Sequence, residues 1–237
     1  MNREAFIRTE QLIGEQALKR LAESRVAVFG IGGVGGYVAE ALARCGVGFL
    51  DLFDNDVVSE SNLNRQIIAL HSTIGAYKVD VMKTRIADIC PAIQVRAHRC
   101  FYMPENADMY PFSAYDYVVD AVDTVTAKLT IIERAKAANI SVISCMGTGN
   151  KLDASKLQVT DITKTDTCPL ARVMRKELRD RGIDHLKVLF SSEPPRKPKT
   201  ESLNEAGKHP PASIAFVPAT AGLLIANEVI RDLIAIT

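Results

Sequence analysis

The chain has 237 residues and a formal net charge of +1, with 47% hydrophobic and 24% charged residues. This composition suits one globular domain with a sizeable core, and the small net charge excludes a nucleic-acid partner recognised by overall charge, so that such a partner needs a local basic patch. The five cysteines include no C-x-x-C pair, which argues against a disulfide framework and against a structural zinc site.

The first predicted element is a helix over 4–23, whose apolar spacing makes Leu12, Leu18 and Leu21 candidates for burial. Strands then alternate with helices. The strands are expected at 25–29, 49–53, 93–97, 117–120 and 140–145, and the helices at 34–45, 77–89 and 125–138. This alternation predicts a Rossmann-like α/β fold, a doubly wound and mostly parallel sheet with helices on both faces.

After Gly149 the rhythm changes, which predicts a C-terminal extension of strands and helices. We expect strands at 157–162 and 186–190, a helix at 169–181, a mobile loop at 191–213, and a final strand and helix within 214–236. There is no internal repeat and no sign of an independent second domain. The prediction is therefore a single domain over 1–237, with a first half at 1–150 and a second half at 151–237.

Neither end of the chain indicates a membrane. The start, 1–8, is polar and lacks an apolar signal core. The most apolar stretch, 214–237, contains Glu228, Arg231 and Asp232, whose charges would be costly in lipid. We therefore expect a core helix there, no membrane contact and a cytoplasmic location.

The first strand runs directly into a glycine-rich turn and then into a helix. The glycines are Gly30, Gly32, Gly33 and Gly35. Such glycines let the backbone approach phosphates, and the helix start offers unpaired N–H groups. Asp54 ends the second strand about twenty residues further on, where a carboxylate that binds ribose is expected. This pattern predicts a nucleotide site, but by itself it fits an NAD enzyme at least as well as an ATP enzyme.

Two cations beyond Asp54 separate these readings. Arg65 and Lys78 follow the ribose carboxylate, and an NAD fold has no need for them there. Attack on the α-phosphorus of ATP does need fixed cations, because charge builds on the phosphates as pyrophosphate leaves. The plainer readings are a surface ion pair for Arg65 and a solvated helix start for Lys78, although the helix dipole disfavours a lysine at that position. The chain has no G-x-x-x-x-G-K loop, so AMP transfer is favoured over γ-phosphate transfer.

Together these motifs resemble the adenylation domain of the ubiquitin-activating-enzyme-like superfamily, which includes ThiF- and MoeB-like proteins. The resemblance implies ATP and Mg²⁺ as cofactors. It implies nucleotide contacts for the glycines and for Asp54, Asp56, Asn62, Asn64, Arg65, Gln66, Lys78 and Asp123. It implies catalytic roles for Arg65, Lys78 and Asp123, with Asp123 holding magnesium or placing the reacting carboxylate. Arg8 matches an arginine that reaches the partner's ATP across a homodimer, and it reads equally well as an exposed helix residue.

Within the superfamily the chain resembles the tRNA threonylcarbamoyladenosine dehydratases most. The resemblance lies in 14–18, 62–66, 120–123 and 157–161. It implies that ATP adenylates the carboxylate of threonylcarbamoyladenosine in the tRNA anticodon loop, after which the side chain closes into a ring with net loss of water. The alternative is an adenylyltransferase for the C-terminal carboxylate of a ubiquitin-like sulfur carrier, but such enzymes commonly carry zinc-binding C-x-x-C pairs. A nucleotide-dependent binding module and an NAD dehydrogenase are further alternatives, which the charged set at the site argues against.

A basic stripe supplies the local patch that RNA requires. Arg172, Arg175, Lys176 and Arg179 fall on one face of a predicted helix, near further cations at Arg196, Lys197, Lys199 and Lys208. Without the resemblance, a solvated helix face and a flexible linker would be the better reading.

Cys168 comes just before that helix, where its thiolate would be stabilised. We interpret it as structural, because ring closure needs no thiol. The alternative is a covalent step with a sulfurtransferase or cysteine desulfurase as partner.

Overall fold

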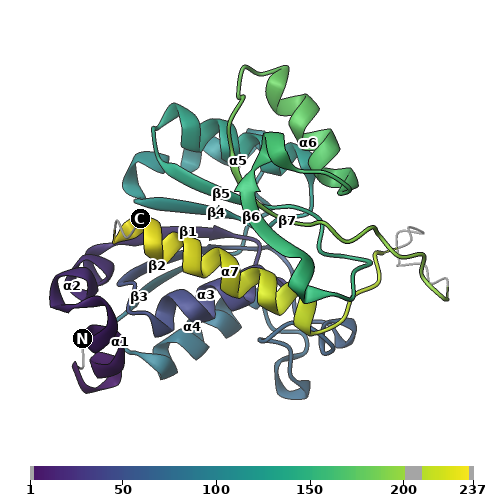
Figure 1. Cartoon of the computed structure of the whole chain (residues 1–237). Coiled ribbons are helices and arrows are strands. Elements are labelled where there is room, and N and C mark those ends of the chain that lie inside the picture. Colours follow the sequence, from purple (N-terminus) through teal and green to yellow (C-terminus); the bar gives the residue numbers. More distant parts are fainter. Residues whose placement is uncertain (1–2, 201–209, 235–237) are drawn as a thin grey trace.

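The centre of the fold is a seven-stranded sheet with the strand order β3-β2-β1-β4-β5-β7-β6 (Figure 1). The computed structural model describes residues 3–200 and 210–234. The strands are β1 (Arg25–Phe29), β2 (Phe49–Phe53), β3 (Gln94–His98), β4 (Tyr117–Asp120), β5 (Ser141–Cys145), β6 (Leu157–Asp161) and β7 (Lys187–Ser191). All neighbours pair in parallel except β6 and β7, which are antiparallel. The order reverses between β1 and β4, so the loops after these strands diverge and leave a site for a ligand.

Helices cover both faces of this sheet. They are α1 (Ile7–Ile13), α2 (Glu15–Glu23), α3 (Gly35–Arg44), α4 (Lys78–Ile89), α5 (Val125–Ala137), α6 (Pro169–Arg179) and α7 (Phe216–Leu233). Alternate residues of β1 face opposite layers: Val26 and Val28 share one core cluster with α3, α4 and α7. Ala27 and Phe29 share the other cluster with α5 and α6. Figure 1 shows α7, in yellow, lying across the sheet beside α3. The predicted doubly wound α/β fold is confirmed.

The N-terminal prediction is partly wrong, because the helix expected over 4–23 is divided at Gly14. Gly14 has φ +86°, a left-handed conformation that ends α1 before α2 begins. No residue of α1 is buried. Leu21 is fully buried as expected, whereas Leu12 is 86% exposed.

The C-terminal prediction is wrong in one element, because 214–234 holds a helix and no strand. Residues 210–215 are irregular and lead directly into α7. The expected mobile loop, 191–213, was placed one residue too early, because Ser191 is the last residue of β7. Its residues 201–209, which include Lys208, lie outside the described part of the chain. Among the described helices, none has the length and apolar character needed to cross a membrane.

Candidate active site

The glycine turn packs backbone to backbone against the loop that follows β4. A Cβ on Gly30, which has φ +86°, would lie 2.6 Å from the carbonyl oxygen of Ala121. A Cβ on Gly35 would lie 1.7 Å from the carbonyl oxygen of Gly30. Larger residues are therefore excluded at both positions. By contrast, a Cβ on Gly32 would meet nothing closer than Gln66, at 3.9 Å, so the turn is open at Gly32, beside the start of α3.

Asp54 is fixed against this turn by its own two oxygens. Oδ2 accepts a hydrogen bond from the Ile31 N–H at 2.7 Å, and Oδ1 accepts one from the Asp56 N–H at 2.8 Å. Burial raises the pKa of Asp54, and the nearby Lys78 partly opposes that rise. The carboxylate thus lies beside the glycine turn at the end of β2, the position expected for a ribose contact.

Lys78 begins α4 and pairs with the second acidic residue of this segment. Its Nζ lies 2.7 Å from Asp56 Oδ2, and its backbone N–H donates to the Asp56 carbonyl at 3.0 Å. Lys78 is buried, with 5% of the residue exposed. The unfavourable helix dipole at this position is therefore offset by a carboxylate. Asp56 holds the lysine, and its expected contact with the nucleotide stays a prediction.

Arg65 and Asn64 form a hydrogen-bonded pair next to the turn. Arg65 Nη1 donates to the Ser61 carbonyl at 2.9 Å and to Asn64 Oδ1 at 2.8 Å. Asn64 Nδ2 donates to the carbonyl of Ser213, in the segment before α7, at 3.1 Å. Both ends of the Asn64 amide therefore have protein partners. This geometry suits Asn64 for orienting Arg65 better than for binding a nucleotide.

Asn62 and Gln66 are both buried beneath the same segment. Asn62 Oδ1 accepts a hydrogen bond from the Ser59 N–H at 3.1 Å, which closes the short 3-10 helix Glu60–Asn62. Gln66 Oε1 has no hydrogen-bond partner among the described residues. The amide of Gln66 therefore remains available beside Gly32.

Asp123 lies in the loop after β4, and it is exposed. Its loop meets the glycine turn at Ala121, which brings Asp123 to the same edge of the sheet as Asp54 and Lys78. Within the described residues its carboxylate has no hydrogen-bond or ion-pair partner. It is therefore available to a ligand.

A buried ionic cluster behind this loop was missed by the sequence analysis. It consists of Asp120, Lys128 and Ser144. Lys128 Nζ lies 2.9 Å from Asp120 Oδ2, with both side chains at most 1% exposed. The signal that points to Lys128 is a lysine set in the apolar run of α5, beside Leu129, Ile131 and Ile132, which are all buried.

Arg8 and the basic stripe are mostly exposed. Arg8 is exposed on α1, and no hydrogen bond or ion pair in the described chain joins it to the turn. On α6, Arg172, Lys176 and Arg179 are exposed. Arg175 is half-buried, and its Nη1 donates to the carbonyl and hydroxyl of Thr165, at 2.5 and 2.6 Å. Arg175 therefore anchors α6 and is less available to RNA than its neighbours.

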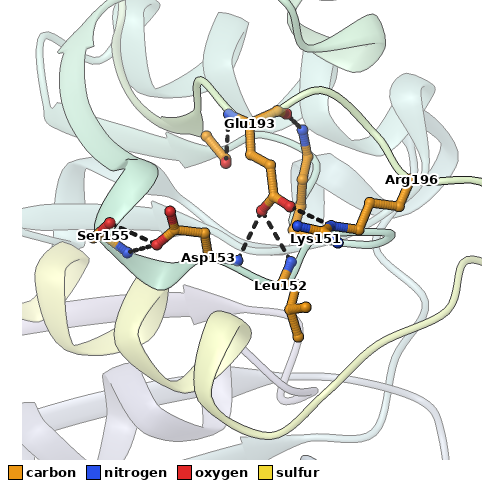
Figure 2. Close-up of polar contacts among 7 residues, drawn as sticks. Lys151, Leu152, Asp153, Ser155, Glu193 and Arg196 are labelled. Atoms are coloured by element: carbon orange, nitrogen blue, oxygen red, sulfur yellow. Dashed lines mark hydrogen bonds and ion pairs between the residues drawn. The ribbon is translucent and has the colours of Figure 1, made fainter.

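The start of the predicted loop is fixed by Glu193, as Figure 2 shows. Glu193 Oε2 accepts hydrogen bonds from the N–H groups of Leu152 and Asp153, at 2.9 and 2.8 Å. Its Oε1 accepts from Arg196 Nε at 2.8 Å, and its carbonyl accepts from the buried ammonium of Lys151. Arg196 is thus partly committed to Glu193, while its side chain remains largely exposed.

Cys168 occupies the N-cap position of α6, makes no side-chain capping hydrogen bond and is 3% exposed. Its Sγ lies against Gly147, since a Cβ there would be 3.6 Å from the sulfur. The thiol is therefore buried next to the end of β5. This position favours the structural interpretation.

Comparison with known proteins identifies the family of this chain. The ThiF family model matches residues 6–236. A tRNA threonylcarbamoyladenosine dehydratase of Bacillus subtilis is 44% identical over 97% of this chain and 94% of its own. The crystal structure of the Escherichia coli enzyme with AMP superposes with a TM-score of 0.91 and 34% identity, covering 98% of this chain and 95% of that one. The same enzyme with ATP gives a TM-score of 0.89 at the same identity and coverage. The chain therefore belongs to the ThiF family and, within it, to the tRNA threonylcarbamoyladenosine dehydratases.

Proposed function

We propose that this chain uses ATP to cyclise threonylcarbamoyladenosine in the tRNA anticodon loop, by adenylating its carboxylate. The observation that carries the proposal is the convergence of Asp54, Arg65, Lys78 and the Asp123 loop on one glycine turn. The dehydratase names of the relatives, and the AMP and ATP bound to the E. coli enzyme, support the same reaction. The sulfur-carrier alternative has less support.

Each group in the site has a distinct task in this reaction. Asp54 holds the ribose, and the open backbone at Gly32 with the start of α3 receives the phosphates. The substrate carboxylate attacks the α-phosphorus, and the bond to pyrophosphate breaks. Arg65 and Lys78 stabilise the charge that develops on the phosphates at this point. Attack within the activated side chain then closes the ring and expels AMP, which carries away one carboxylate oxygen, so that the net change is loss of water.

Magnesium fits this site only together with ATP. The described residues contain no cluster of three or more acidic, histidine or cysteine side chains that could hold a metal ion. Asp123 offers a single free carboxylate at the open edge of the site. Mg²⁺ typically takes one or two carboxylates and completes its shell with phosphate oxygens and water. Asp123 would therefore hold the ion against the phosphates, where the ion neutralises their charge.

A homodimer would complete the site with Arg8 from the partner. The helix α1 carries Arg8 on a surface where Ile7 and Leu12 are 50% and 86% exposed. Arg8 is exposed beside them, so its side chain is free to reach a partner. Two such copies would place each Arg8 at the other's triphosphate.

Transfer RNA would dock on α6 and the segment after β7. Arg172, Lys176 and Arg179 are exposed on α6, and Lys197 and Lys199 are exposed in 192–200. Such cations bind phosphates without reading sequence. We also propose a cytoplasmic location, which a tRNA substrate supports. A sulfurtransferase or cysteine desulfurase partner would be needed only if Cys168 took part covalently.

The test is a reaction with purified components. The enzyme, ATP and tRNA that carries linear threonylcarbamoyladenosine should yield AMP and pyrophosphate, with one nucleoside lighter by one water for each AMP formed. Mass spectrometry of the digested tRNA measures this, and the Lys78→Ala variant serves as the inactive control. If ATP–pyrophosphate exchange occurs only when a small protein ending in Gly-Gly is supplied, the sulfur-carrier alternative is correct and the proposal is wrong.

A further inference from the structure

The ammonium of Lys128 is completely buried and joins the ends of two strands. It donates to Asp120 Oδ2, at the end of β4, at 2.9 Å, and to the carbonyl of Cys145, at the end of β5, at 2.7 Å. The hydroxyl of Ser144 donates to the same Asp120 oxygen at 2.5 Å. Asp120, Lys128 and Ser144 are each 0% exposed. Substrate cannot reach this cluster, so none of its members is a catalytic residue.

Stability does not account for such an arrangement. Removing two charges from water costs about as much as their attraction returns, and apolar side chains of similar volume often stabilise a fold equally well. What the ions supply, and apolar contacts do not, is a fixed set of directions and distances.

The cluster fixes the loop that carries Asp123. The second oxygen of Asp120, Oδ1, accepts a hydrogen bond from the Val122 N–H at 3.2 Å. The N–H of the intervening Ala121 donates to the carbonyl of Phe29 at 2.8 Å, and its own carbonyl packs against Gly30. The loop is thus held between the buried cluster on one side and the glycine turn on the other. Asp123 is the next residue after this clamped dipeptide.

We propose that Lys128 is a positioning residue for adenylation, which acts through Asp120 and Ser144 to set the loop at 121–123. The loop then presents Asp123 to the magnesium and phosphates and supports the glycine turn from behind. This inference rests on the proposed function in so far as Asp123 acts on ATP. A displacement of about 1 Å at such a site can lower turnover about a hundredfold, so a remote buried lysine can control the rate.

Two variants test the proposal. The double variant Asp120→Leu/Lys128→Met removes both charges together, so that no buried ion is left unpaired. Ser144→Ala removes one hydrogen bond to Asp120 and leaves the ion pair in place. Thr130→Val is the matched control, because Thr130 is a buried hydroxyl of the same helix that donates to the Thr126 carbonyl. Each protein is compared with the wild type for its melting temperature, for kcat and KM for ATP, and for amide hydrogen exchange at 121–124.

We expect Ser144→Ala and the double variant to melt close to the wild type. Their kcat should fall, by about tenfold or more in the double variant, with KM for ATP little changed and with faster exchange at 121–124. Thr130→Val should match the wild type in kcat and exchange. A folded Ser144→Ala or double variant with the kcat and the amide hydrogen exchange of the wild type would overturn the proposal. If the double variant does not fold, the result for Ser144→Ala decides alone. Hydrogen exchange needs neither ATP nor tRNA, so it tests the positioning role even if the proposed reaction fails.

Discussion

Lys78 and Asp56 form an ion pair of unequal exposure, with Nζ 2.7 Å from Oδ2 and with side chains that are 7% and 60% exposed. The lysine approaches from the protein interior and the aspartate from solvent. The lysine is therefore held in place before ATP arrives, with its ammonium against the exposed carboxylate of Asp56. Such prior orientation is what stabilises a transition state at little further cost.

Replacing Lys78 with alanine should lower kcat about a hundredfold, because one fixed cation is removed where charge develops on the phosphates. ATP binding, measured by calorimetry, should weaken less than the rate of AMP formation falls. Lys83→Ala is the control, since Lys83 is an exposed lysine of the same helix α4. Equal losses in the two variants, or an unchanged rate for Lys78→Ala, would contradict the assignment.

Arg8 provides a test of the dimer. If each site combines Lys78 of one protomer with Arg8 of the other, then Arg8→Ala and Lys78→Ala should each be inactive alone. Mixing them should restore activity, because one site of each mixed dimer contains both intact residues. Random exchange predicts recovery to about a quarter of the wild-type rate. Co-purification of two differently tagged protomers from the mixture shows whether exchange has taken place. No recovery of activity after such exchange would remove Arg8 from the partner's site.

Much of the fold was predictable because buried parallel strands are short, nearly continuous apolar runs. This holds for β1 and β4, which are almost wholly buried. The prediction of a strand near 214 was wrong because it treated Pro218 as a residue that a helix cannot contain. Pro218 lies in the first turn of α7, where proline is tolerated. The prediction for Leu12 assumed one continuous helix, and Gly14 interrupts it.

The candidate site was predictable where neighbouring residues in the sequence carry the signal, as for the glycine turn and Asp54. It was not predictable where the partner is distant. Asn64 bonds to Ser213 and Arg175 bonds to Thr165, and no local pattern reveals either contact. The same reason explains why the pairing of Lys128 with the end of β5 was missed.

The basic stripe predicts different outcomes for residues that look alike in the sequence. Replacing Arg172, Lys176 and Arg179 together with alanine should weaken tRNA binding and make it less dependent on salt. The slope of the logarithm of the binding constant against the logarithm of the salt concentration should become shallower by roughly 0.7–0.9 for each phosphate that the protein no longer neutralises. Arg175→Ala should instead lower the melting temperature, because its hydrogen bonds to Thr165 are internal. Filter binding over a range of salt concentrations measures the first effect. An unchanged slope in the triple variant would place the RNA elsewhere.

Glu193 predicts a pH-dependent contribution to stability. The hydrogen bond from Arg196, followed by those from the Asp153 and Leu152 N–H groups, lowers the pKa of Glu193 from 4.5 to about 2. Because the folded pKa lies below the unfolded one, the contribution is complete above about pH 4.5 and is lost as the pH falls towards about 2. Glu193→Gln should therefore cost about 1–2 kcal/mol of unfolding free energy at neutral pH, and the cost should shrink in acid. Urea unfolding at several pH values measures this, with the exposed Glu105→Gln as control; a cost independent of pH would refute the ionic role.

Cys168 gives the sharpest separation between a dehydratase and an enzyme that forms a thioester. Its sulfur is buried against Gly147 at the start of α6, whereas reactive cysteines are usually partly exposed. Ring closure within one side chain also leaves no step for a thiol to perform. Cys168→Ser should therefore keep most of the wild-type kcat, and iodoacetamide should modify the half-buried Cys45 and Cys100 before Cys168. The outcome that contradicts this is a loss of activity in Cys168→Ser while Cys168→Ser and Cys168→Ala are both as stable as the wild type. In that case the thiol takes part in the reaction, and its buried position must open during the catalytic cycle.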